Sequence, residues 1–274
     1  MVVREEPVRV TFANSMEFLT WGEGSRTLLF LPGGPGSALP GGMTGRMSRR
    51  WFDPFVEAAY AVWYVTRARN MPQGHSVADM ADDCAAAISA RLGGRVDLVV
   101  GESYGGMIAQ HLAARHGDCV GRVALVAAAA EVSTWGKEVD ARLASALVRD
   151  DSTGVGVAFA EYVLPGRRAT WIRRLVGPWM ARGLLSEKNY PRSDLLVETE
   201  AEIAFDAWSA LPRIRVPVVL LCGDRDLFFP TGIVDETVRL IPDCTLVRYE
   251  GQGHVKVASS RRVPLDVLAF VERR

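Results

Sequence analysis

The chain alternates short apolar runs with longer amphipathic segments. Three runs are almost continuously apolar, as is typical of strands buried on both faces of a sheet: 27–31, 59–65 and 96–100. Further strands are predicted over 8–13, 16–21, 120–128, 216–221 and 245–249. Amphipathic helices are predicted over 77–92, 104–116 and 231–240, and another helix at the C-terminus. This order predicts a mostly parallel twisted sheet with helices on both faces.

The alternation stops between Glu131 and Pro212. This stretch has amphipathic segments interrupted by prolines and glycines, and it holds four of the seven tryptophans, at positions 135, 171, 179 and 208. We interpret it as an α-helical cap inserted into an α/β core, which divides the chain into 1–130, 131–212 and 213–274. Most of the cap tryptophans are expected to bury their helices on the core. Any that line a site would favour an apolar acyl or alkyl group.

Charge and hydropathy exclude several classes of partner. The chain has 274 residues with 32 basic and 32 acidic side chains, so it lacks the basic excess typical of nucleic-acid binding. Its first ten residues mix both charges, unlike a secretory signal, and no apolar stretch is long enough for a spanning helix. We therefore expect a soluble, cytoplasmic protein with no nucleic-acid or membrane partner. The sequence leaves its oligomeric state open.

Metal and cofactor signatures are missing from the sequence. The four cysteines, at positions 84, 119, 222 and 244, are far apart and form no C-x-x-C pair, which favours buried thiols over zinc ligands. The chain also lacks a P-loop, G-x-G-x-x-G and H-E-x-x-H. We therefore expect neither a cofactor nor a metal.

The strongest motif is Gly-Glu-Ser-Tyr-Gly at 101–105. It lies between a predicted strand and a predicted helix, which is the setting that a nucleophile elbow requires. The sharp turn would place Ser103 at the carboxyl end of the strand, beside the positive end of the helix dipole. The simpler interpretation is a glycine-rich turn with an N-capping serine. We favour Ser103 as a nucleophile because a base and an acid are also available.

A serine nucleophile needs a base and a group that orients the base. Of the four histidines, His254 follows the last predicted strand in a glycine-rich loop, where ligands of parallel sheets bind. The others are expected in packing, helix-end or turn roles: His75, His111 and His116. The acid should follow another strand, and the Gly-Asp-Arg-Asp loop offers Asp224 and Asp226. We choose Asp226, because it lies farther into the loop, and expect Asp224 to close a turn.

These motifs together resemble the α/β-hydrolase fold with a helical cap. The elbow, the G-x-x-D loop at 223–226 and the terminal Gly-His at 253–254 match that family's pattern. The resemblance implies oxyanion donors in the backbone N–H groups of Gly34 and Tyr104. The family's oxyanion loop commonly begins with histidine, whereas this chain has Pro32 before Gly-Gly-Pro-Gly. This departure concerns the details of the loop and the substrate subgroup rather than hydrolysis.

The expected function is cofactor-independent hydrolysis of a carboxylic ester by Ser103, His254 and Asp226, through an acyl-enzyme. The substrate would be a small molecule with an apolar acyl or alkyl part. One alternative is a proline iminopeptidase-like aminopeptidase, and another is a receptor-like ligand-binding protein with slow turnover. The aminopeptidase would need carboxylates for a substrate ammonium. The acidic cluster Glu198, Glu200, Glu202 and Asp206 is a candidate, although a solvated helix face is the interpretation that we prefer.

Overall fold

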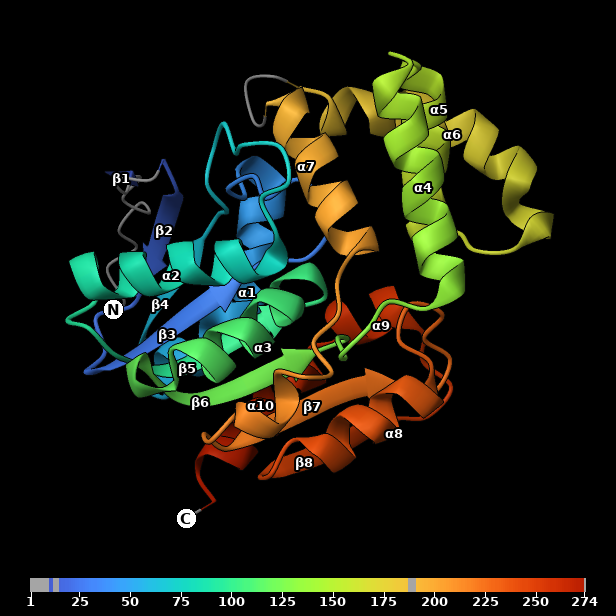
Figure 1. The fold of residues 1–274 in the computed structure, drawn as a ribbon. Coiled ribbons are helices and arrows are strands. Elements are labelled where there is room, and N and C mark those ends of the chain that lie inside the picture. The colour runs from blue at the N-terminus through green and yellow to red at the C-terminus, as the bar shows by residue number, and fades with distance from the viewer. Residues whose placement is uncertain (1–9, 12–14, 187–190, 274) are drawn as a thin grey trace.

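One mixed sheet forms the centre of the molecule (Figure 1). The computed structural model describes all residues except 1–9, 12–14, 187–190 and 274. Within them eight strands pair in the order β1-β2-β4-β3-β5-β6-β7-β8. From β4 onward all pairs are parallel, while β1 and β2 are antiparallel to their neighbours. The strands are β1 Val10–Thr11, β2 Glu17–Trp21, β3 Arg26–Leu31, β4 Tyr60–Val65, β5 Val96–Glu102, β6 Val120–Val126, β7 Val218–Gly223 and β8 Cys244–Tyr249.

Helices cover both faces of this sheet. Successive residues of β3 point to opposite sides, so that Leu29 and Leu31 belong to one core and Leu28 and Phe30 to the other. The first core is closed by α2 (Val77–Arg91), α3 (Tyr104–Arg115) and α8 (Thr231–Leu240). The second is closed by α1 (Gly42–Glu57), α9 (His254–Ala258) and α10 (Arg262–Val271). The predicted mostly parallel sheet with helices on both faces is confirmed.

In the described part of the chain, two short 3-10 turns and four α-helices separate β6 from β7. The α-helices are α4 (Thr134–Val148), α5 (Ser152–Val163), α6 (Thr170–Leu184) and α7 (Arg192–Ile203), and we call them the inserted helices. Figure 1 shows them as one group beside the carboxyl ends of the central strands. Part of this group has its own small core, in which Leu143, Val155 and Leu195 are fully buried. The cavity beside Ser103 is lined by residues of the core and by Phe159, Tyr162 and Glu202 of the inserted helices.

Several elements differ from the sequence-based expectation. Helix α1 was not predicted, although Trp51, Phe52, Phe55 and Val56 recur at helical spacing; Phe52 and Phe55 are buried in the second core. Strand β7 starts two residues later than expected, at Val218, because Pro217 has no N–H for a ladder bond. Of the predicted strand 8–13, only Val10–Thr11 lies within the described residues, and it forms β1.

Candidate active site

Ser103 sits on a sharp turn between β5 and α3. Its φ of 49° and ψ of −112° are strained for a residue with a side chain, and its N–H donates to the carbonyl of Val126 at 2.8 Å. The turn requires glycine two residues later, since a Cβ at Gly105 would lie 2.0 Å from the carbonyl oxygen of Leu31. The local sequence therefore forces α3 against β3 and turns the Ser103 side chain out of the sheet.

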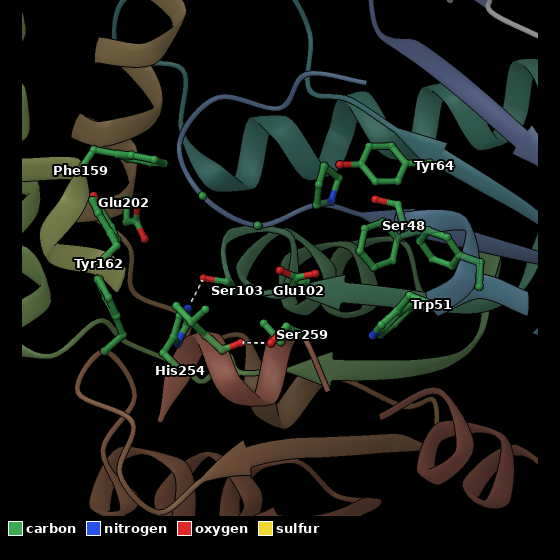
Figure 2. A pocket seen from close by; sticks show the side chains of 18 residues that line it. Ser48, Trp51, Tyr64, Glu102, Ser103, Phe159, Tyr162, Glu202, His254 and Ser259 are labelled. Carbon is green, nitrogen blue, oxygen red and sulfur yellow. Dashed lines mark hydrogen bonds between the residues drawn. The ribbon is translucent and has the colours of Figure 1, made fainter. Parts of the chain in front are cut away.

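The structure brings Ser103, His254 and Asp226 into one hydrogen-bonded chain. Ser103 Oγ lies 2.9 Å from His254 Nε2, and His254 Nδ1 lies 2.8 Å from Asp226 Oδ2. Figure 2 shows the Ser103–His254 contact in the cavity. A carboxylate that accepts from Nδ1–H leaves Nε2 free to accept the Ser103 proton. This arrangement can activate a serine hydroxyl.

Asp226 is fixed by the loop that follows β7. Its side chain is buried, and its Oδ1 accepts hydrogen bonds from the backbone N–H groups of Phe228 and Phe229 at 2.9 and 3.0 Å. The other oxygen is thereby directed at His254. Asp224 is exposed and accepts instead from the N–H of Gly251 at 2.7 Å, which joins the loops after β7 and β8.

The other histidines lie outside this constellation. His75 Nε2 contacts Asp83 Oδ2 at 2.9 Å, and His116 Nε2 contacts Asp82 Oδ1 at 2.6 Å. His111 packs edge-on against Phe205, with ring centroids 5.7 Å apart. Burial and nearby arginines lower the pKa of His111, so it is held neutral in a packing position. The structure places only His254 beside Ser103.

The loop at 32–36 passes directly over Ser103. A Cβ at Gly33 would lie 3.1 Å from Ser103 Cβ, so the backbone approaches the serine more closely than a larger residue allows. Gly34 has a φ of +68°, in the left-handed region that favours glycine. Figure 2 shows this loop crossing above Ser103. Both residues expected to supply oxyanion N–H groups, Gly34 and Tyr104, thus lie in segments next to the serine.

A buried ion pair between Arg67 and Glu198 fixes the position of the loop at 32–36. The guanidinium of Arg67, in the segment after β4, donates to the carbonyls of Pro32 at 3.0 Å and Gly34 at 2.8 Å. It also pairs with Glu198 of α7 through Nε to Oε1 and Nη2 to Oε2, and Glu198 Oε2 accepts from the N–H of Gly36 at 2.6 Å. Burial alone would lower the pKa of Arg67, but Glu198 reverses this and raises it. Sequence reasoning missed this pair, since its members are 131 positions apart.

Tyr104 joins the same network through its side chain. Its hydroxyl donates to the backbone carbonyl of Glu198 at 3.0 Å, and the Arg67 guanidinium lies 4.4 Å from the centre of its ring. Burial, reinforced by Glu198, raises the pKa of Tyr104 well above its ordinary value. Both segments that would supply oxyanion donors are therefore tied to helix α7.

A cavity of about 470 Å³ opens onto Ser103. Its walls are mainly aromatic, and α1, α5 and the core strands all contribute: Phe30, Trp51, Phe52, Tyr64, Phe159, Tyr162 and Phe228. The expectation that cap tryptophans bury their helices is wrong for Trp171 and Trp179, which are 67% and 75% exposed on α6. Trp135 and Trp208 are partly buried against the core. The aromatic lining near Ser103 therefore comes from other residues.

The preferred interpretation of the acidic cluster as a solvated face is also wrong for two of its members. Glu198 and Glu202 are 0% and 3% exposed, whereas Glu200 and Asp206 face solvent. Residues 198 and 202 are one helical turn apart, so they share the inward face of α7. Glu202 lines the cavity, as does Glu102, whose pKa burial raises to about 7 while His254 opposes the rise.

The part of the chain that the structure describes has no candidate metal site. No group of three or more histidine, cysteine or acidic side chains there has metal-binding geometry. The four cysteines are free, with Cys84 and Cys222 buried and Cys119 and Cys244 half-buried. No helix among the described residues is long and apolar enough to span a membrane.

Comparison with known proteins identifies the class. A model of the alpha/beta hydrolase family matches residues 28–265, and this chain belongs to that family and is a hydrolase. It is 30% identical to RutD of Yersinia enterocolitica, whose name proposes a carbamate hydrolase, over 73% of this chain and 72% of that protein. It is 32% identical to a pimeloyl-[acyl-carrier protein] methyl ester esterase of Chromobacterium violaceum, over 62% of this chain and 68% of that one.

Solved structures share the fold at lower identity. A hydrolase from Pseudomonas aeruginosa PA01 superposes with a TM-score of 0.74 at 18% identity, covering 98% of this chain and 99% of that one. An enol-lactonase from Burkholderia xenovorans LB400 gives 0.70 at 22% identity, covering 94% and 97%. The predicted α/β-hydrolase fold is confirmed.

Proposed function

We propose that this hydrolase cleaves carboxylic esters through an acyl-enzyme on Ser103, with His254 as general base and acid and Asp226 as its orienting carboxylate. The observation that carries the proposal is the Ser103–His254–Asp226 hydrogen-bonded chain at the mouth of an aromatic cavity. The esterase relative in Chromobacterium violaceum supports the choice of bond.

In the first half-reaction Ser103 Oγ attacks the ester carbonyl while its proton passes to His254 Nε2. The imidazolium that forms is stabilised by Asp226. The backbone N–H groups of Gly34 and Tyr104 donate to the developing oxyanion. Collapse of the tetrahedral intermediate breaks the bond to the alcohol oxygen, which takes the proton from His254 Nε2.

In the second half-reaction water replaces the alcohol. Its proton passes to His254 Nε2 as its oxygen attacks the acyl-enzyme carbonyl, and collapse returns that proton to Ser103 Oγ. The products are the carboxylic acid and the free enzyme. No cofactor or metal enters either step.

The cavity supports a substrate with an apolar acyl or alkyl part. Aromatic side chains from the core and from α5 form its walls, and such walls bind apolar groups by excluding water. We also propose that the inserted helices act as a cap, which is supported by the positions of Phe159, Tyr162 and Glu202 in the cavity wall (Figure 2).

A fluorophosphonate probe tests the nucleophile, because it reacts only with an activated serine. We expect one adduct by intact mass, lost in Ser103→Ala, and an adduct that persists in this variant would contradict the assignment.

Chromogenic esters compared with prolyl and other aminoacyl amides test which bond the enzyme cleaves. Turnover of esters is expected, whereas faster turnover of a prolyl amide would favour the aminopeptidase alternative. Labelling and binding without turnover of either class would favour the receptor-like one.

A further inference from the structure

Two neighbouring buried carboxyl groups, of which Glu202 lines the catalytic cavity and Asp140 lies behind it, have more acceptor oxygens than the protein satisfies. Glu202 of α7 is 3% exposed and Asp140 of α4 is 0% exposed. Asp140 Oδ1 accepts a hydrogen bond from the Tyr162 hydroxyl. Asp140 Oδ2 and Glu202 Oε2 are buried and have no hydrogen-bond partner within the described residues. Buried acceptors in this state are uncommon and costly, so they call for an explanation.

The Glu202 carboxyl faces the reacting serine. It lines the same cavity as Ser103 and His254. Figure 2 shows its side chain beside Phe159 and Tyr162, with the carboxyl end directed toward Ser103. A ligand that fills this cavity can therefore contact the Glu202 carboxyl group where Phe159 and Tyr162 form the wall.

The charge around the two carboxyl groups is unbalanced. Arg67 is the buried cation whose charge acts on Glu202. Its guanidinium, however, is already paired with Glu198 and hydrogen-bonded to two loop carbonyls. Arg142 of α4 acts on Asp140 but is paired with Glu161 at 3.2 Å. The remaining titratable groups that face the pair are Glu198 on α7, Tyr104 on α3, Tyr162 on α5 and His254 in the cavity. None of these four supplies a fixed positive charge.

Without a countercharge, this pair of carboxyl groups favours binding a proton. Burial raises the pKa of Glu202 well above its ordinary value, and Asp140 raises it further. Burial likewise raises the pKa of Asp140, against the hydrogen bond from Tyr162. Two buried carboxylates that face each other without a countercharge cannot both ionise cheaply. A ligand that brings a positive charge would displace this proton.

We propose that Glu202, supported by Asp140, forms a subsite for a substrate ammonium group, so that the preferred substrates are esters with a primary or secondary amine on an apolar chain. An ammonium group in the cavity brings N–H donors to the Glu202 carboxylate and supplies the missing countercharge for both acidic groups. A substrate with a carboxylate at this position is repelled. The proposal rests on the ester hydrolase function of the same site and names its substrate class.

Matched esters test the subsite. Methyl ω-aminoalkanoates are compared with methyl alkanoates of equal chain length, in which a methyl group replaces the ammonium, across chains of about five to eight atoms. At pH 8 the best aminoalkanoate should have a kcat/KM at least tenfold above its isostere, because a buried charged pair loses much of its binding when one partner is removed. Equal values for both esters in the native enzyme would overturn the proposal.

Two variants on α7 locate the effect. Glu202→Gln should reduce the preference, taken as the ratio of the two kcat/KM values, to about one, with folding checked by thermal melting. Glu200→Gln is the matched control, since Glu200 is exposed on the same helix, and it should retain the full preference. If Glu202→Gln keeps the preference for the aminoalkanoate ester, another residue recognises the ammonium group and the proposal is overturned.

A binding measurement separates this proposal from the proposed function and needs no variant. Hexylammonium should slow fluorophosphonate labelling of Ser103 at concentrations at least tenfold below those of hexanol, and more strongly at pH 8 than at pH 6. If neutral methyl esters are cleaved without this selectivity, the subsite fails and the esterase stands. If the ammonium protects selectively but no ester is cleaved, the subsite stands and the esterase fails. Equal protection by both compounds overturns the subsite.

Discussion

Two aspartates separated by one residue in the loop after β7 have different roles in the structure. Asp226 is buried and bonds His254, whereas Asp224 is exposed and bonds the N–H of Gly251. Asp226→Asn should lower kcat by about 10⁴, the scale observed when a triad aspartate is neutralised and the histidine tautomer is lost. Asp224→Asn keeps an acceptor for Gly251 and should change kcat by less than about tenfold. Steady-state ester kinetics on both variants measure the difference, and the reverse order of effects would contradict the assignment.

Glu202 gives a residue-level prediction about stability. Because burial raises its pKa in the folded protein, the unfolded chain releases the proton at lower pH than the folded one. The native protein therefore loses stability as pH rises above the ordinary glutamate value, about 4.3, toward the raised one. Glutamine does not titrate, so Glu202→Gln should gain Tm relative to native between pH 5 and pH 8. This gain should increase steadily from pH 5 to pH 8.

Thermal melts of the native protein, Glu202→Gln and Glu200→Gln across this pH range supply the measurement. The Glu200 variant should follow the native curve, because its side chain is exposed. A difference between Glu202→Gln and native that stays constant with pH would show that Glu202 does not hold a raised pKa. A gain in stability on removing a cavity carboxyl is the pattern expected where a site is kept for binding at a cost in stability.

At the scale of elements, the sequence pattern predicted the buried strands and the turn at Ser103, because residues close in sequence determine both. The runs around β3, β4 and β5 are apolar because both faces are buried, and the elbow glycines are needed within a few residues of Ser103. The orientation of α7 depends instead on tertiary partners. The inward turn of Glu198 and Glu202 could not be read from spacing alone, since acidic residues four apart are equally typical of an exposed face.

The Arg67–Glu198 pair connects α7 and the segment after β4 to the loop at 32–36, and it gives a prediction at the scale of elements. Glu198→Gln leaves the Arg67 guanidinium buried without its countercharge and weakens its hold on the carbonyls of Pro32 and Gly34. Because that loop would stabilise charge formed only in the transition state, kcat should fall by about 10- to 10³-fold with little change in KM. Binding of a boronic acid that mimics the tetrahedral state should weaken in parallel.

Glu200→Gln again serves as the control on the same helix, and its kinetics should match those of the native enzyme. Unchanged kcat and boronate binding in a folded Glu198→Gln protein would mean that the loop keeps its position without the pair. A rise in KM alone would assign Glu198 to substrate binding rather than to positioning of the loop.

At the scale of the molecule, α7 ties the inserted helices to the core through two buried carboxylates. Its Asp194 carboxylate accepts from the N–H groups of Asn70 and Met71, both at 2.8 Å, and its Glu198 binds Arg67. Helices α5 and α6 pack closely on each other, since a Cβ at Gly156 would lie 1.9 Å from the carbonyl oxygen of Gly177. The exposed residues of α6 form a stripe one turn apart: Trp171, Leu175 and Trp179.

This attachment predicts an uneven distribution of local stability. Amide hydrogen exchange should be slowest in β5, β6 and α3, whose residues are largely buried in the core, and fastest among the helices in α5 and α6. Asp194→Asn replaces a charged acceptor of two N–H groups with a neutral amide, so it should accelerate exchange in α7 and in the segment 67–71 together, while β5 and β6 remain unchanged. Mass spectrometry of peptic peptides measures each segment. Equal acceleration in the sheet and in α7 would show that the inserted helices open only when the whole molecule unfolds.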